Sequence, residues 1–274
     1  MFEPLVRSAL LEDLGRGGDL TSDAIVGQDV RGQVAVVARQ PGVVAGLDPA
    51  LMAFHLIDPR LVFDVQHDIG RRVQPGDVIV VVSGPARAML TAERVALNFL
   101  GHLSGVATAT ASLVEAVRGT RTGIACTRKT TPGMRALEKA AVLSGGGVNH
   151  RFGLDDAILI KDNHLAFAGN ITEAVRMARD RAGHLVKIEV EVDTLDQLRE
   201  LLTCEADAVL LDNMTTDQLT EAVGLIDGRM IIEASGRITV ETAAAIAATG
   251  VDLISVGWLT HSAPVLDFGL DYHG

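Results

Sequence analysis

Basic residues gather in one short stretch of a chain that is otherwise acidic. Between residues 128 and 151 there are five basic side chains and one acidic one, whereas the whole chain has a formal charge of −11. The basic residues are Arg128, Lys129, Arg135, Lys139 and Arg151, and the acid is Glu138. A planar guanidinium binds a carboxylate through two parallel hydrogen bonds. A small ligand with several negative charges is therefore predicted for Arg128, Lys129 and Arg151, whereas the spacing of Arg135 and Lys139 fits a solvated helix face.

Polar or small residues lie at the C-terminal end of each apolar run from residue 124 onward. They are Arg128 and Lys129, Lys161 and Asp162, Glu191, Asp212 and Asn213, Ser235 and Gly236, and Gly257. In α/β barrels the C-terminal ends of the strands meet at one face, and that face holds the active site. We therefore expect these residues to lie together at one end of a barrel.

The apolar runs alternate with helical stretches that begin at cap residues and end near glycine. The runs span residues 124–127, 157–160, 186–192, 208–211, 230–234 and 252–256. No Gly-rich turn of the nucleotide-binding type follows them, which favours a closed barrel over a doubly wound sheet. The prediction is a TIM-like α/β barrel with six or seven parallel strands, fewer than the usual eight.

The first hundred residues predict a different, mixed α/β layer. A helix is expected at 4–14 and strands at 33–39, 43–45, 61–65 and 78–82, separated by turn signals such as Pro41-Gly42. A long helix over 86–117 follows, broken or bent near Gly101 and Gly105. The fold class is therefore α/β, with an N-terminal α/β open-sandwich domain at 1–107 and the barrel domain at 108–274. The extreme C-terminus is expected to pack back on the N-terminal domain.

The segment KIEVEV shows which residues of one strand point into the barrel. Alternation along a strand places Lys187, Glu189 and Glu191 on one side and the intervening Val and Ile residues against the helices. A buried structural pair is the favoured role for Lys187 and Glu189. Glu191, at the end of the strand, is the functional candidate.

Composition excludes several classes of protein. A length of 274 residues allows one large or two modest domains, and the charge of −11 argues against a nucleic-acid partner. Cys126 and Cys204 lack metal-ligand spacing, so we expect reduced thiols and a cytoplasmic location. Residues 95–114 carry no Asp, Glu, Lys or Arg, but Ser, Thr, Asn and His recur among them. A closely packed helix is therefore favoured over a membrane span.

At this point a family resemblance emerges, carried by ordered motifs. They are TRKTTPGMRALEKA (127–140), SGGGVNHRFGLDDAILIKDNH (144–164), EVEVD (189–193), LLDN (210–213) and EASG (233–236). Together they resemble quinolinate phosphoribosyltransferase, and the resemblance extends from EDLGRGGDLTS (12–22) through LTAER (90–94) to VGWLTHS (256–262). One departure is Ala140 or Ala141, where the family often has an aromatic residue. That difference concerns helix packing more than chemistry.

The resemblance implies a pentosyltransferase of NAD biosynthesis. Quinolinate attacks C1 of phosphoribosyl pyrophosphate, pyrophosphate leaves, and loss of CO₂ gives nicotinate mononucleotide. By the same resemblance Arg128, His150, Arg151 and Lys161 bind quinolinate, with Arg94 supplied by the neighbouring subunit of a homodimer. Lys129 serves the pyrophosphate or carboxylate side. Lys129, Lys161, Glu191 and Asp212 form the catalytic set.

The remaining implied roles concern metal and phosphate. Glu191 and Asp212 stabilise positive charge on the ribose or hold its Mg²⁺, the implied cofactor. The 5′-phosphate is expected at Ser235, Gly236 and Gly257, with His261 as a further contact.

Three other functions stay open on the sequence alone. The first is a related protein encoded with molybdate transporters, which shares the ACTRK and PG motifs. The second is a lyase in which Lys161 forms a Schiff base. The third is a sensor that binds phosphoribosyl pyrophosphate without reaction. The glycines 145–147 could hold phosphate, although ending a helix is their favoured role.

Overall fold

The computed structural model describes residues 2–273, which divide into two compact units. The first unit comprises the residues up to 111, residues 131–146 and those from 262 on. The second comprises residues 112–130 and 147–261. The domain boundary predicted at 107/108 stays a prediction.

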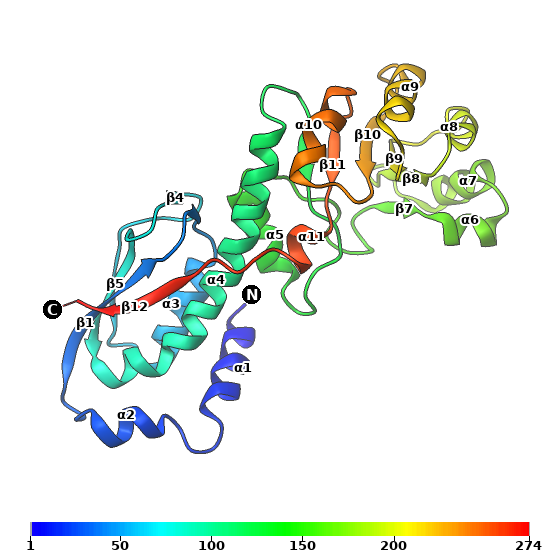
Figure 1. The fold of residues 1–274 in the computed structure, drawn as a ribbon. Coiled ribbons are helices and arrows are strands. Elements are labelled where there is room, and N and C mark those ends of the chain that lie inside the picture. The colour runs from blue at the N-terminus through cyan, green and yellow to red at the C-terminus, as the bar shows by residue number, and fades with distance from the viewer. Residues whose placement is uncertain (1, 274) are drawn as a thin grey trace. The chain divides into compact units, whose positions relative to one another are not determined.

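The first unit contains an antiparallel sheet in the order β12-β1-β5-β3 and a separate pair β2-β4. Its strands are β1 (Arg31–Ala38), β2 (Gly42–Val43), β3 (Val62–Val65), β4 (Arg72–Val73), β5 (Val78–Pro85) and β12 (Phe268–Tyr272). Its helices are α1 (Glu3–Leu14), α2 (Leu20–Ile25), α3 (Leu47–Ile57) and α5 (Arg135–Ser144). The C-terminal strand β12 lies beside β1, with Leu270 opposite Val36 (Figure 1). The last residues of the chain thus complete the sheet formed by the first hundred.

Helix α4 (Ala86–Ala116) is continuous, so of the two possibilities expected near Gly101 and Gly105, a break or a bend, the break is wrong. A side chain at Gly105 would place its Cβ 2.1 Å from the carbonyl oxygen of Pro264. At Gly101 the carbonyl accepts a hydrogen bond from the amide of Leu266 at 3.0 Å. These glycines serve close approach of the chain near its C-terminus. Among the described residues, no helix is both long enough and apolar enough to span a membrane.

The second unit is a TIM-like barrel of six parallel strands, as predicted, in the order β6-β11-β10-β9-β8-β7. Strands β7 to β11 are labelled in Figure 1. The strands are β6 (Gly123–Ala125), β7 (Ile158–Ile160), β8 (Ile188–Val192), β9 (Ala208–Asp212), β10 (Ile231–Ser235) and β11 (Leu253–Ser255). The helices are α6 (Asp162–Ala168), α7 (Ile171–Arg181), α8 (Leu195–Leu201), α9 (Thr216–Ile226), α10 (Val240–Ala248) and α11 (Trp258–His261). Thr194 and Thr215 start α8 and α9 through capping boxes with Gln197 and Gln218.

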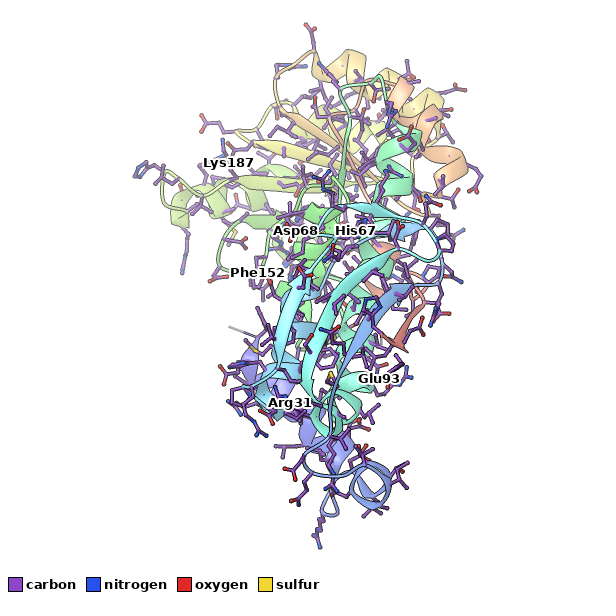
Figure 2. The ribbon with its side chains drawn as sticks, turned by 90° about the vertical axis from the view of Figure 1, so that its left-hand side faces the viewer. Arg31, His67, Asp68, Glu93, Phe152 and Lys187 are labelled. Carbon is purple, nitrogen blue, oxygen red and sulfur yellow. The ribbon has the colours of Figure 1, made fainter. Side chains whose placement is uncertain are left out.

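The alternation along β8 is confirmed for its apolar residues and corrected for one predicted pair. Ile188, Val190 and Val192 are buried. Lys187, labelled in Figure 2, however, precedes the strand. Its side chain is 72% exposed, and its Nζ lies 2.7 Å from Oδ1 of Asp207. Glu189 lies further inside the barrel and contacts His150 instead. The predicted Lys187–Glu189 pair is therefore wrong.

Helix α5 corrects a second expectation. Lys139 is buried rather than solvated, and Arg135 is half-buried. Helix α5 ends at Ser144, with Gly145 as its C-cap. A Cβ at Gly145 would lie 2.4 Å from the carbonyl oxygen of Ala107 in α4. The first glycine of the triple, Gly145, therefore ends helix α5 and packs closely on α4.

Candidate active site

The C-terminal ends of the parallel strands border a cavity of about 460 Å³ in the second unit. Most of the residues predicted for the site line it. These are Arg128, Lys129, His150, Arg151, Lys161, Glu191, Asp212 and Ser235. Residues that are remote in sequence thus meet at one end of the barrel because every strand runs in the same direction.

Two arginines face this cavity with part of their hydrogen-bonding capacity unused. The Nε atoms of Arg128 and Arg151 are buried and have no hydrogen-bond partner. Burial lowers the pKa of Arg151, and the positive charge of Arg128 lowers it further. Asp156 fixes the loop that carries Arg151, because its carboxylate accepts the amides of Phe152 and Gly153. Two neighbouring, half-buried arginines whose buried Nε donors are unused are suited to an anion.

The ring of His150 is held within the protein. Its Nε2 lies 2.8 Å from Oε2 of Glu189, and its Nδ1 accepts the backbone amide of Arg151 at 2.7 Å. Because Nδ1 accepts, the ring proton lies on Nε2 and points to Glu189. In this arrangement His150 positions the backbone of Arg151.

Carboxylates on β8 and β9 face the same cavity. Glu191 forms an ion pair with Nζ of Lys161, and its side chain is 14% exposed. Asp212 accepts a hydrogen bond from Nδ2 of Asn213 at 2.6 Å. Two carboxylates at one cavity wall are ligands that Mg²⁺ prefers. Their donor set therefore fits the implied metal, with Glu191 and Asp212 as the residues that would hold it.

The turns after β9 and β10 have unusual backbone conformations. Asn213, Gly236 and Arg237 have φ values of 55°, 107° and 49°. A Cβ at Gly236 would lie 2.3 Å from Oδ1 of Asn213, so this position requires glycine. Asn213, Gly236 and Arg237 line, with Met214, a second cavity of about 460 Å³.

Gly257 lies beside two of the predicted phosphate and catalytic residues. A Cβ there would lie 2.9 Å from Cδ of Lys129 and 3.6 Å from Nε2 of His261. The carbonyl of Lys129 accepts the hydroxyl of Thr260 at 2.8 Å, which ties the loop after β6 to α11. Gly257 and His261 thus lie next to Lys129.

Arg94 belongs to the first unit. It lies on α4, its side chain is 64% exposed, and it lines a cavity of about 440 Å³ together with Glu12, Asp13 and His102. Its predicted role concerns a second copy of the chain and stays a prediction.

Sequence reasoning missed Glu233 and Ser255 and assigned Glu189 a different role. Glu233 and Ser255 line the cavity at the strand ends, here called the main cavity, and the side chain of Glu233 is 3% exposed. The alternation used for β8 also applies to β10, where Glu233 and Ser235 share one face. That pattern in IIEAS could have identified Glu233.

Known proteins are similar to this chain over nearly its full length. The family descriptions "Quinolinate phosphoribosyl transferase, N-terminal domain" and "C-terminal domain" match residues 19–104 and 106–271. Nicotinate-nucleotide pyrophosphorylase [carboxylating] of Mycobacterium leprae is 46% identical over 97% of this chain and 95% of its own length. A probable enzyme of the same name from Bacillus subtilis is 44% identical over 98% and 93%.

Solved structures give the same result. The crystal structure of NadC from Streptococcus pyogenes matches with a TM-score of 0.95 and 41% identity, covering 100% of this chain and 97% of that one. The nicotinate-nucleotide pyrophosphorylase of Ehrlichia chaffeensis matches with a TM-score of 0.95 and 36% identity, covering 100% and 99%. With both family domains matched and relatives similar over nearly the full length, the chain belongs to the quinolinate phosphoribosyl transferase family.

Proposed function

We propose that the chain transfers the phosphoribosyl group of phosphoribosyl pyrophosphate to quinolinate, with release of pyrophosphate and CO₂, to give nicotinate mononucleotide. Membership of the family supports this reaction. The observation that carries it is the cavity itself. Arginines with unused buried donors and the carboxylates Glu191 and Asp212 line the same end of one barrel.

Quinolinate carries two carboxylates, which need cationic partners. Arg128 and Arg151 are assigned to them because their Nε atoms lack partners inside the protein. Lys161 is assigned the same substrate and also pairs with Glu191, so it links the acid-binding part of the cavity to the ribose-binding part. His150 acts on this substrate through the backbone of Arg151, which its Nδ1 holds.

Departure of pyrophosphate leaves positive charge on the ribose. Glu191 and Asp212 stabilise that charge electrostatically, because they are carboxylates at the wall of a partly enclosed cavity. Mg²⁺, when bound by these residues and the substrate, neutralises charge on the leaving pyrophosphate. Lys129 serves the pyrophosphate or the carboxylate side. Ser235, Gly236, Gly257 and His261 are assigned to the 5′-phosphate, which small residues allow to approach the backbone.

One assay tests the reaction. Quinolinate absorbance should fall only when phosphoribosyl pyrophosphate and Mg²⁺ are both present, and nicotinate, which has one carboxylate, should be a poor substrate. Equal rates on nicotinate would contradict the assignment of the arginines. Binding of phosphoribosyl pyrophosphate without release of pyrophosphate would indicate a sensor. Trapping of Lys161 by borohydride would indicate a lyase.

A homodimer with shared sites is the proposed assembly, in which Arg94 of one subunit completes the cavity of the other. Mixing inactive Arg94→Ala with inactive Lys161→Ala subunits would create hybrids with one intact site. After subunit exchange at equal concentrations, activity should recover to about a quarter of the wild-type value. No recovery, with hybrids demonstrated by native mass spectrometry, would show that Arg94 has no role across the interface. The cytoplasmic location also stays a prediction.

A further inference from the structure

Glu233 is the most deeply buried acidic side chain that lines the main cavity. It lies on β10, and its side chain is 3% exposed. Ser255 on the adjacent strand β11 also lines the cavity, and its hydroxyl is a hydrogen-bonding neighbour of the Glu233 carboxyl group. An isolated carboxylate in such a position is strongly disfavoured, whereas a neutral carboxyl group is tolerated.

The basic groups near Glu233, His150 and Lys161, lower its pKa, but each is hydrogen-bonded to another carboxylate. Nε2 of His150 lies 3.7 Å from Oε1 of Glu233, but it donates its proton to Glu189 at the shorter distance of 2.8 Å. Lys161, at the end of β7, is paired with Glu191. Burial raises the pKa of Glu233 to about 7, and the nearby carboxylate of Glu189 adds to the rise. Near neutral pH the cavity therefore contains a carboxylic acid that can give up a proton.

The proposed reaction needs such a proton at one defined step. We infer that Glu233 is the acid that protonates C2 of the pyridine ring when the C2 carboxylate leaves as CO₂. This inference rests on the proposed function. The bond between C2 and the carboxylate breaks, its electron pair stays on C2, and CO₂ departs. That pair takes the proton of Glu233, forming the C2–H bond and leaving a carboxylate that regains its proton from water.

The position of Glu233 separates this role from that of the other acids. Asp212 is the last residue of β9 and Glu191 the last but one of β8, whereas Glu233 lies two residues before the end of β10. The side chain of Glu233 is 3% exposed, against 14% for Glu191. A group deeper in the barrel can act on the ring without competing for the ribose. Its burial also limits access of water, which favours proton transfer from a fixed acid.

The variant Glu233→Gln tests the inference because it keeps the shape of a neutral carboxyl group and removes the proton. Release of pyrophosphate and of labelled CO₂ from carboxyl-labelled quinolinate would be measured together. Pyrophosphate release should stay within about threefold of wild type, whereas CO₂ release should fall at least about tenfold below it. The undecarboxylated mononucleotide should then accumulate. Equal loss of both products, or a preserved one-to-one ratio, would overturn the inference.

The matched control is Glu138→Gln, a buried glutamate of the first unit that accepts hydrogen bonds from His102 and the amide of Thr131. It should leave the ratio of CO₂ to pyrophosphate at one. Wild-type protein that releases no pyrophosphate would refute the proposed function itself, which is a different result from coupled release in Glu233→Gln.

Two measurements on the wild-type protein extend the test and do not depend on folding of the variant. Raising the pH through 7 to 9 removes the proton of Glu233, so the ratio of CO₂ to pyrophosphate should fall. The groups that face Glu233 are Glu189 on β8, His150 after β6, Lys161 after β7 and Ser255 on β11. A constant ratio over this range would overturn the inference.

The second measurement is a titration with Co²⁺ alone, because ligand atoms of His150, Glu189 and Glu233 lie within 4.8 Å of one another. No Co²⁺ spectrum from these residues is expected, and one that Glu233→Gln abolishes would assign a metal site instead.

Discussion

At the N-terminal end of the barrel strands, charged side chains are paired with one another and with the backbone, whereas at the C-terminal end buried donors of two arginines are unused in the part of the chain that the structure describes. Asp207, just before β9, accepts the amide of Ile188 at 2.9 Å and pairs with Lys187 and Arg179. Asp252, just before β11, repeats this pattern, because it accepts the amide of Ile232 at 2.9 Å and pairs with Arg121. Each aspartate ties its own strand to the neighbouring one.

At the other end, within residues 2–273, the buried Nε atoms of Arg128 and Arg151 have no hydrogen-bond partner, and the buried side chains of Glu233 and Ser255 are hydrogen-bonding neighbours of each other. Leaving one buried polar group unsatisfied costs about 1 to 3 kcal/mol, so this end lowers stability. A substrate with matching charges can recover that free energy on binding. The two ends of the barrel therefore differ in role: charged side chains at the N-terminal end stabilise the barrel, whereas those at the C-terminal end are suited to binding a ligand.

The largest expected effect concerns Arg151, with Arg179 as its counterpart at the opposite end. Arg151→Ala should weaken transition-state binding by about 2 to 5 kcal/mol, the usual loss for a buried paired charge. Its free energy of unfolding should fall by only about 1 kcal/mol, because Nη1 donates a single hydrogen bond, to the carbonyl of Ala157, and Nε has no partner among the described residues. Steady-state kinetics and urea unfolding measure the two quantities.

Arg179→Ala should give the opposite result. Its Nε is also buried without a partner, but its Nη2 donates to the carbonyl of Glu205 and to Asp207. Stability should fall while kcat/KM stays the same. A loss of kcat/KM in Arg179→Ala equal to that in Arg151→Ala would remove the distinction between the two ends.

The next effect concerns the carboxylates that handle the ribose. Glu191→Ala and Asp212→Ala should each lower kcat at least about a hundredfold, because a removed electrostatic stabiliser costs about 3 kcal/mol. Binding of quinolinate should stay within about a factor of ten, or 1.4 kcal/mol. Calorimetry with quinolinate alone measures this binding. Lost binding with preserved turnover at saturation would reverse the assigned roles.

A smaller effect is expected on stability at the N-terminal end. Burial alone would raise the pKa of Asp207, but hydrogen bonds from Lys187, the Ile188 amide and Arg179 hold it at about 2, below its ordinary value of 3.8. The lowered pKa means that Asp207 stabilises the fold above about pH 4 and loses this contribution as the pH falls toward 2. The contribution is about 2 kcal/mol. Asp207→Asn should therefore lower the free energy of unfolding at pH 7 by that amount and flatten its decrease between pH 4 and 2. An unchanged pH dependence would contradict this role.

The sequence predicted the barrel and its active end because both depend on local pattern. Strand alternation and polar residues after each apolar run identified Glu191 and Asp212, and the motifs identified Arg151. Contacts across sequence distance were not accessible in this way. Glu189 was assigned to Lys187, although the nearer partner in space is His150, which comes from the loop after β6. Likewise Gly101 predicted a break or a bend of the helix, whereas in the structure its lack of a side chain admits the backbone at Leu266, more than a hundred residues later.

The smallest expected effect concerns Arg237. Its left-handed backbone conformation is one that glycine adopts at the other end of the barrel strands. At the N-terminal end Gly228 and Gly250 provide left-handed positions before β10 and β11, whereas after β10 an arginine has a φ of 49°. A non-glycine residue in this region costs about 1 kcal/mol, so the arginine is kept against its conformational preference. No hydrogen bond or ion pair engages it within the described residues 2–273, and it lines the cavity beside Gly236.

Arg237→Gly should leave kcat and stability within about 1 kcal/mol and raise the KM for phosphoribosyl pyrophosphate by about threefold to tenfold, because an exposed cation contributes about 1 kcal/mol to phosphate binding. Arg237→Lys, which keeps the charge in the same strained conformation, should restore most of that KM. An unchanged KM in Arg237→Gly would place the guanidinium outside the phosphate site and leave the strained turn without a role in binding.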